Sequence, residues 1–177
     1  MKRRSFVLLL VLVAVALALA MPVAAIVTKG SVTSNRGAKG VRLGMTRAQV
    51  IEKLGKPVFK NANGYMQYGS DKLGIAFDVY LDTSAKPARV RLIGINGAGF
   101  CLVGGGPCLM EKGGVGKLNA RYGSALETVM LEDGEEVVWL KGTFRGCPVF
   151  TDFGEANRKP STRIGMVFIG FQSGTAC

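Results

Sequence analysis

The sequence predicts an α+β protein that begins with an export signal and continues as two tandem units. Each unit is a short helix, or helical hairpin, packed on an antiparallel meander of three or four strands. Three observations support this fold class: a charged and then apolar N-terminus, a capped helix followed by three strand-like stretches, and the same order of elements in the second half. The expected boundaries are 1–25 for the signal, 26–40 for a flexible lead, 41–97 for the first unit and 98–177 for the second, disulfide-containing unit.

The N-terminal segment has the pattern of a signal peptide. Residues 2–4 are basic, residues 6–20 are apolar without interruption, and small residues follow. Cleavage after Ala20 or after Ala25 fits the small-x-small rule. Because residues 5–28 carry no charge and are long enough to span a bilayer, an uncleaved membrane anchor is the alternative. In both cases the body of the chain is exported, to the periplasm or the medium, and this segment is the only membrane contact that we expect.

The rest of the chain is basic. Three of the 23 lysines and arginines lie in the signal, so the remainder carries 20 against 12 acidic residues, a net charge of +8. The basic residues are scattered along the sequence and do not form one run. Such a charge suits anionic lipid headgroups, wall polymers or an acidic partner outside the cell, or it serves solubility alone. We expect no nucleic-acid partner.

Four cysteines in an exported chain predict two disulfides. Three pairings are open from the sequence. The glycine-containing stretch CLVGGGPC can close easily, which favours Cys101 with Cys108 and leaves Cys147 for Cys177. We expect no metal site, because the chain has no histidine and its cysteines lack paired C-x-x-C spacing.

The first unit opens with a helix that has signals at both ends. Thr46 is placed as its N-cap, and Gln49 three residues later completes a capping box. Gly55 is placed as the C-cap glycine, and Pro57 prevents the helix from continuing.

Strands are then predicted over residues 65–69, 73–81 and 88–95. Alternation in the second of these strands places Leu73, Phe77 and Val79 on one face and Asp78 and Tyr80 on the other.

The second unit repeats this order. The stretch LNARYG at 118–123 aligns with VIEKLG at 50–55, and strands are predicted over 137–142, 147–153 and 162–171. The acidic stretch LEDGEE at 131–136 is typical of a solvated hairpin turn. A single unit covers only one face of its sheet, so two units can bury more apolar surface by packing together.

The segment Lys112–Lys117, KGGVGK, is similar to a phosphate-binding loop. Leu118 occupies the position of the hydroxyl residue that would hold magnesium, and GGGPCLM before the loop is a poor strand. An exported chain also leaves the compartment that holds ATP. We therefore interpret the segment as a glycine-rich start of the second helix, and expect neither a nucleotide nor any other cofactor.

The stretch LGMTRAQVIEKLGKP at 43–57 resembles the opening helix of two related kinds of exported bacterial domain. These are the beta-lactamase inhibitory protein (BLIP-like) fold, with its tandem units, and the SmpA/OmlA family of small outer-membrane lipoproteins. The resemblance covers residues 41–95 and implies a scaffold for protein contact without catalysis. It also implies an aromatic pair before the sheet, which Tyr68 and Tyr65 would supply in the first unit and Trp139 in the second.

This chain departs from both families. The lipoproteins need a cysteine directly after the signal, and none is present here. The inhibitory protein has cysteines in each unit, whereas this chain has none before Cys101. These differences put a role in the barrel-assembly machinery in doubt and leave the partner unnamed.

The sequence offers little for catalysis. Without histidine, general-base catalysis and nucleophile activation lose their usual participant. Asp78 and Asp152 lie at matching places in the two units, and such a pair could serve a hydrolase that acts on wall sugars. Carboxylates in these positions more often pair with cross-strand arginines, for which Arg89 and Arg91 are available.

A binding surface is the better prediction. The sheet face opposite the helices combines aromatic, arginine and carboxylate side chains, as interface hot spots do. Its predicted members are Asp78, Tyr80, Arg89, Arg91, Phe150 and Asp152. For Trp139 and Phe150, burial in the core is the alternative to a place on this binding surface.

We therefore expect an exported, non-enzymatic module that binds a protein or envelope component. The alternatives are a basic module that binds anionic polymer or lipid and, third, a wall-sugar hydrolase.

Overall fold

The computed structural model describes residues 24–155 and 159–173. Over these residues the protein is α+β, with two short helices, a four-stranded mixed sheet and an eight-stranded antiparallel sheet. This confirms the predicted class. Most of the predicted signal, including Ala20, lies outside the described residues.

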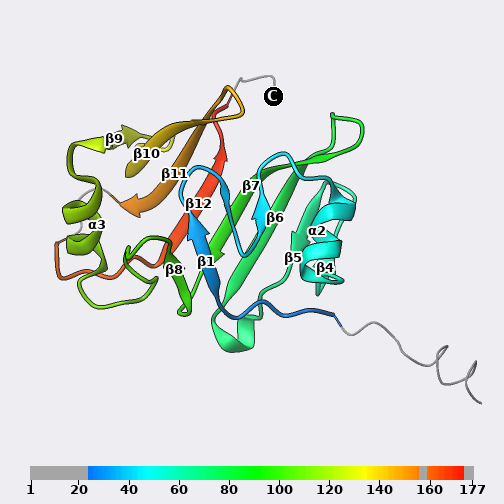
Figure 1. Cartoon of the computed structure of the whole chain (residues 1–177), viewed down its shortest axis with the longest axis horizontal. Coiled ribbons are helices and arrows are strands. Elements are labelled where there is room, and N and C mark those ends of the chain that lie inside the picture. Colours follow the sequence, from blue (N-terminus) through cyan, green and yellow to red (C-terminus); the bar gives the residue numbers. More distant parts are fainter. Residues whose placement is uncertain (1–23, 156–158, 174–177) are drawn as a thin grey trace, which may run out of the picture.

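The large sheet contains strands from both halves of the chain (Figure 1). In spatial order they are β4 (Phe59–Lys60), β5 (Tyr65–Gln67), β6 (Ala76–Asp82), β7 (Arg89–Asn96), β12 (Met166–Phe171), β11 (Cys147–Glu155), β10 (Glu136–Phe144) and β9 (Leu126–Met130). β7 and β12 pair at its centre, from Met166 opposite Asn96 to Gly170 opposite Leu92. The two halves are therefore joined edge to edge by backbone hydrogen bonds.

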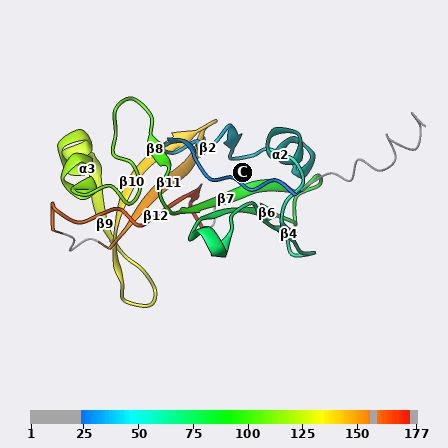
Figure 2. The same ribbon diagram turned by 90° about the horizontal axis from the view of Figure 1, so that it is seen from below.

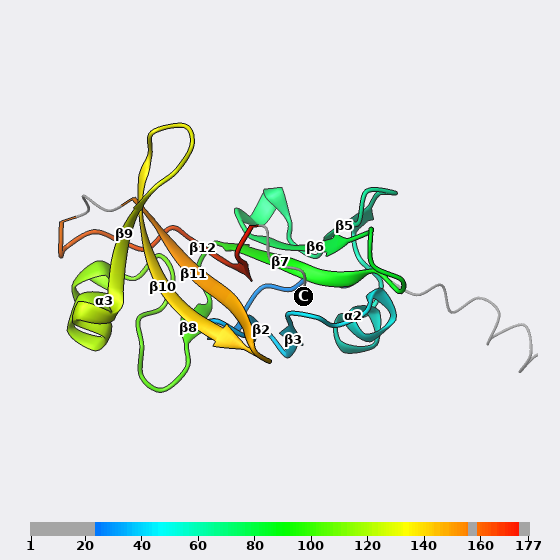
Figure 3. The ribbon, with the colours of Figure 1, turned by 90° about the horizontal axis from the view of Figure 1, so that it is seen from above.

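One side of the large sheet is covered by the helices and the small sheet (Figures 2 and 3). The helices are α2 (Arg47–Leu54) and α3 (Gly114–Tyr122), and the small sheet has the order β3 (Val41–Arg42), β2 (Gly37–Ala38), β1 (Gly30–Thr33) and β8 (Phe100–Leu102). The core lies between the layers, where Val50, Phe100, Phe77 and Ile169 are fully buried. We call residues 24–56 and 98–123, which contain these elements, the covering layer.

Helix α2 has the predicted caps. The Thr46 hydroxyl accepts a hydrogen bond from the Gln49 N–H at 3.3 Å, and the Gln49 side chain accepts one from the Thr46 N–H at 2.9 Å. Gly55 is the C-cap residue with φ of 82°, which favours glycine. The hydroxyl of the buried Tyr68 donates to the Gly55 carbonyl at 3.1 Å, so the end of α2 is held against the chain just after β5.

Most predicted elements lie close to their observed positions, with two exceptions. The strand predicted from residue 73 begins at Ala76 as β6, and Leu73, which is 57% exposed, instead ends a 3₁₀ turn, η1 (Asp71–Leu73). The second exception follows helix α3, whose start at Gly114 lies within the Lys112–Lys117 segment and agrees with the interpretation of that segment as the start of the helix. A second 3₁₀ turn, η2 (Gly123–Ala125), then leads into β9, a strand that the sequence did not predict.

The predicted flexible lead, 26–40, is wrong for most of its length. It contains β1 and β2, and Val27, Val32 and Ala38 are buried in the core. The physical reason is pairing that is distant in sequence: β1 runs parallel to β8, and the Val27 N–H donates to the Tyr68 carbonyl at 2.7 Å. Short-range periodicity carries no signal for such partners.

The Cys101–Cys108 disulfide is present as predicted. It closes the glycine-containing loop that follows β8. Cys147 is also disulfide-bonded. Its predicted partner, Cys177, lies outside the described residues.

The capping box gives a direct test of α2. We expect Thr46→Ala to lower the free energy of unfolding by about 1 kcal/mol, because a helix N–H loses its acceptor. Thr46→Ser keeps the hydroxyl and is the matched control. Urea unfolding measures both, and an equal loss in the two variants would show that the hydroxyl does not stabilise the helix.

Candidate functional site

The uncovered side of the large sheet, which we call the open face, carries two rows of side chains. Residues directly opposite each other in neighbouring strands point to the same face of a sheet. The first row consists of Tyr65, Tyr80, Leu92, Gly170, Phe150 and Lys141. The second consists of Phe59, Gln67, Asp78, Gly94, Phe168, Asp152, Trp139 and Glu127. Each row crosses β7 and β12, so both halves of the chain contribute to one surface.

The residues between these rows point the other way. Val79, Ile93, Ile169 and Thr151 are register partners in successive central strands, and all four are fully buried beneath the covering layer. The alternation of the strands thus separates the core from the open face.

Aromatic rings gather at both ends of the open face. In the first half, the Tyr65 ring lies 5.9 Å from that of Phe59 and 5.1 Å from that of Tyr80, measured between centroids. In the second half, Trp139 stacks on Phe150 with centroids 4.4 Å apart and an interplanar angle of 11°. Such offset or stacked pairs add to the stability that ring burial provides.

Two glycines at the centre make room for rings from the adjacent strands. A Cβ atom on Gly94 would lie 2.9 Å from Cε1 of Phe168. A Cβ atom on Gly170 would lie 2.7 Å from Cδ1 of Leu92 and 3.2 Å from Cε1 of Phe150. The rings of Phe168 and Phe150 therefore occupy the space above these glycines, and the apolar surface continues across the centre of the sheet.

Asp78 is half-buried on this face and accepts a hydrogen bond from the Tyr65 hydroxyl at 2.9 Å. Burial raises the pKa of Asp78 above its ordinary value, and the Tyr65 hydroxyl partly offsets this. Burial and the adjacent Asp78 also raise the pKa values of Tyr65 and Tyr80. Both tyrosines therefore stay neutral at physiological pH.

Asp152 occupies the corresponding place in the second half. Its side chain is directly opposite Trp139, the residue is 9% exposed, and it accepts a hydrogen bond from the Gly154 N–H at 2.7 Å. Asp78 and Asp152 lie in one row but on β6 and β11, with β7 and β12 between them. Three strand spacings separate their backbones by roughly 14 Å. The carboxylate pairs of glycosidases are about 5–10 Å apart, so this arrangement does not favour the hydrolase hypothesis.

The predicted arginines lie beside the rows, at the start of β7. Arg89 donates from Nη1 to the Gly44 carbonyl at 3.0 Å. Arg91 falls at the register shift between β6 and β7 and has no partner in either row. The two arginines line a cavity of about 50 Å³ at the start of β7, together with Asp82 and Phe171. The expected pairing of Asp78 with Arg89 or Arg91 is wrong. Asp78 lies directly opposite Gly94, whereas Arg89 lies opposite Asp82, and the Tyr65 hydroxyl contacts the Asp78 carboxylate instead.

Sequence reasoning placed four of its six predicted residues in these rows: Asp78, Tyr80, Phe150 and Asp152. It did not assign Phe59, Leu92 or Phe168 to the surface. Phe168 alternates with the buried Val167 and Ile169, so strand parity could have identified it. Phe59 lies in a two-residue strand that leaves no pattern.

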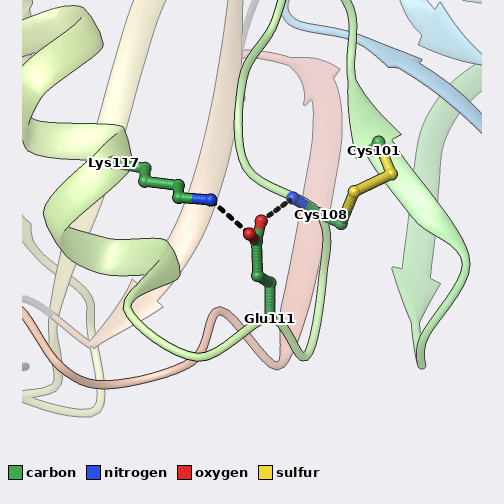
Figure 4. Close-up of polar contacts among 4 residues, drawn as sticks. All are labelled: Cys101, Cys108, Glu111 and Lys117. Carbon is green, nitrogen blue, oxygen red and sulfur yellow. Dashed lines mark hydrogen bonds and ion pairs between the residues drawn. A yellow bond between two sulfur atoms is a disulfide. The ribbon is translucent and has the colours of Figure 1, made fainter.

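The lysine- and glycine-rich segment lies on the covered side and joins α3 to the disulfide loop (Figure 4). Glu111 accepts a hydrogen bond from the Cys108 N–H at 3.0 Å and forms an ion pair with Lys117. The Lys117 ammonium holds the pKa of Glu111 below its usual range. The second lysine of the segment thus has a structural partner.

Within residues 24–155 and 159–173, no group of three or more Cys, Asp or Glu side chains is placed to hold a metal ion. The same residues include no helix that is long and apolar enough to cross a membrane. Comparisons with protein-family models, with curated proteins and with solved structures find no significant match to this chain.

The raised pKa of Asp78 predicts a pH-dependent stability. A carboxyl with a raised folded-state pKa favours folding below its unfolded pKa, and this contribution is lost as pH rises through the folded pKa. Asp78→Asn keeps an oxygen for the Tyr65 hydroxyl but does not ionise. We expect the variant to be more stable than the parent at pH 7 in urea unfolding, and the difference to disappear near pH 3.

Asp133→Asn, in the exposed β9–β10 hairpin, is the matched control for the loss of one negative charge. A less stable Asp78→Asn variant at pH 7 would contradict the prediction.

The glycine at the centre of the first row gives a further prediction. Gly170→Ala forces Phe150 and Leu92 to move, which we expect to cost about 1–3 kcal/mol of stability. The emission of Trp139, the only tryptophan, should change because Phe150 stacks on it. Gly165→Ala is the control, since its Cβ meets no atom within 4 Å. Unchanged emission and stability in Gly170→Ala would contradict the packing.

Proposed function

We propose that this protein is an exported, non-enzymatic module that binds a protein or envelope component through its open face. The observation that carries the proposal is the continuous aromatic surface formed by the two rows. Phe59 is 51% exposed and Tyr80 is 38% exposed, and tyrosine, tryptophan and phenylalanine are enriched in protein interfaces. Exposed aromatic side chains that gather on one side of a sheet are typical of an interaction site.

Export is part of the proposal. The signal-like N-terminus supports it, and so do the disulfide-bonded cysteines, since disulfides persist in oxidising compartments. Retention of the N-terminal segment as an anchor is the alternative for localisation.

We also propose that the chain consists of two tandem units in the manner of the BLIP-like and SmpA/OmlA domains. Helix α2 is followed by β4 to β7, and α3 is followed by β9 to β12. The order of the large sheet is symmetric about the β7–β12 pair, because each set runs outward from the centre against its sequence order. This layout supports boundaries near 41–97 and 98–177.

A second function has its own support. The covering layer contains ten lysines and arginines and two acidic residues, so this side of the protein suits an anionic lipid or polymer. Binding of that kind falls steeply with salt.

Site-specific photo-crosslinking separates the two functions. A photoreactive residue is placed at Tyr80 on the open face or, as the matched control, at Glu52 on the exposed side of α2, in the full chain in its producing cells. We expect a discrete protein adduct from Tyr80 that weakens with Phe150→Ala in the other half of the face. An adduct from Glu52 alone, or salt-sensitive retention without an adduct at Tyr80, would instead support binding to an anionic surface.

The intact mass of the recovered protein tests export in the same experiment. We expect a chain that begins at Met21 or Ile26 with all four thiols protected from alkylation until reduction. A chain that keeps residue 1 and has four free thiols would contradict export.

A further inference from the structure

The charges of the protein are divided between the two sides of the large sheet. The covering layer is strongly basic, with a net charge of +8 over residues 24–56 and 98–123. Its charged residues are Lys29, Arg36, Lys39, Arg42, Arg47, Glu52, Lys53, Lys56, Glu111, Lys112, Lys117 and Arg121. The overall basic composition therefore describes this side of the molecule only.

The open side is acidic. Asp78, Asp152 and Glu127 lie in the second row, and the turn η1 and the tip of the β9–β10 hairpin project from the same side (Figures 2 and 3). These projections carry five more acidic residues, which are Asp71, Glu132, Asp133, Glu135 and Glu136. Against these eight carboxylates, the rows and the two projections hold two basic residues, Lys72 and Lys141.

The hairpin acids are available to a partner. Lys141 forms an ion pair with Glu127. No ion pair within the described part of the chain involves any of the four hairpin carboxylates. All four residues are exposed at the rim of the aromatic surface. Rim charges of one sign steer a partner of the opposite sign.

We infer that the open face binds a basic protein segment, one that carries arginine or lysine side chains at two separated positions. This inference rests on the proposed docking function and adds the chemistry of the partner. A guanidinium or ammonium group is attracted both to the faces of tyrosine and tryptophan rings and to carboxylates. Acidic polymers and anionic lipids are disfavoured at this face by like-charge repulsion.

Each half of the face has both components. Tyr65 and Tyr80 lie beside Asp78, and Trp139 and Phe150 lie beside Asp152. The two clusters are separated by three strand spacings, roughly 14 Å. An extended segment covers this distance in about four residues, at about 3.4 Å per residue. A partner strand crossing the sheet would thus place a basic side chain at each cluster when the two are four residues apart.

Trp139, the single tryptophan, reports occupancy of the second cluster. The probe is a synthetic extended peptide with two arginines four residues apart, titrated into the disulfide-bonded protein while Trp139 emission is followed. A peptide with glutamates in place of the arginines is the charge-reversed control. We expect saturable binding of the arginine peptide and no response to the glutamate peptide.

Two variants test the location of the charge effect. The hairpin variant removes the four hairpin charges with the substitutions Glu132→Gln, Asp133→Asn, Glu135→Gln and Glu136→Gln. We expect it to bind the arginine peptide about tenfold more weakly. The matched control changes four lysines of the covering layer to glutamine: Lys29, Lys53, Lys56 and Lys112. We expect this control variant to bind the arginine peptide as tightly as the parent.

Three results would overturn the basic-partner inference: equal binding of the glutamate peptide, no saturable response to the arginine peptide, or unchanged affinity of the hairpin variant.

Sedimentation at the same concentrations tests whether a second copy of this chain occupies the open face. If the protein self-associates and the hairpin variant does not, the open face binds the basic covering layer of another copy. This result would overturn the inference of a separate basic partner. If a protein adduct forms at Tyr80 but the arginine peptide does not bind, the proposed docking function stands. Only the inference that the partner is basic is then overturned.

Discussion

The pairing of β7 with β12 is the interaction on which the rest of the structure depends. These strands come from different halves of the chain, and their hydrogen bonds turn two small meanders into one eight-stranded sheet. Because side chains alternate strictly along a strand, this register also decides which residues from the two halves share a face. A shift of one residue would bring Asp152 and Phe168 to the core and Ile169 to solvent.

The same alternation gives the two faces different physical roles. The covered face buries Ile93, Ile169 and Phe77 beneath the helices and the small sheet, and supplies the stability. The open face leaves aromatic rings partly exposed, with Phe59 51% and Tyr80 38% exposed, while Asp152 on the same face is 9% exposed. Gly94 and Gly170 connect these roles, since their missing side chains allow rings from adjacent strands to lie across the centre.

The division of charge gives the molecule an orientation. The basic covering layer suits an anionic surface, and binding there would leave the acidic, aromatic face turned away from that surface. The two proposed binding functions therefore use opposite sides of the sheet and do not compete for the same residues. Net charge alone hides this arrangement, because the basic side outweighs the acidic one.

The sequence by itself determined the local elements: the capped α2, the acidic hairpin, the Cys101–Cys108 loop, and the alternation that places Asp78, Tyr80, Phe150 and Asp152 on one side of their strands. These features depend on interactions between residues near one another in the chain. The tertiary structure decided the β7–β12 junction and the burial of residues 27–38 against β8 and Tyr68. It also decided that Arg89 and Arg91 lie outside the rows and that eight carboxylates gather on the open side. Each of these depends on pairings between distant segments, whose register a single sequence does not encode in any local pattern.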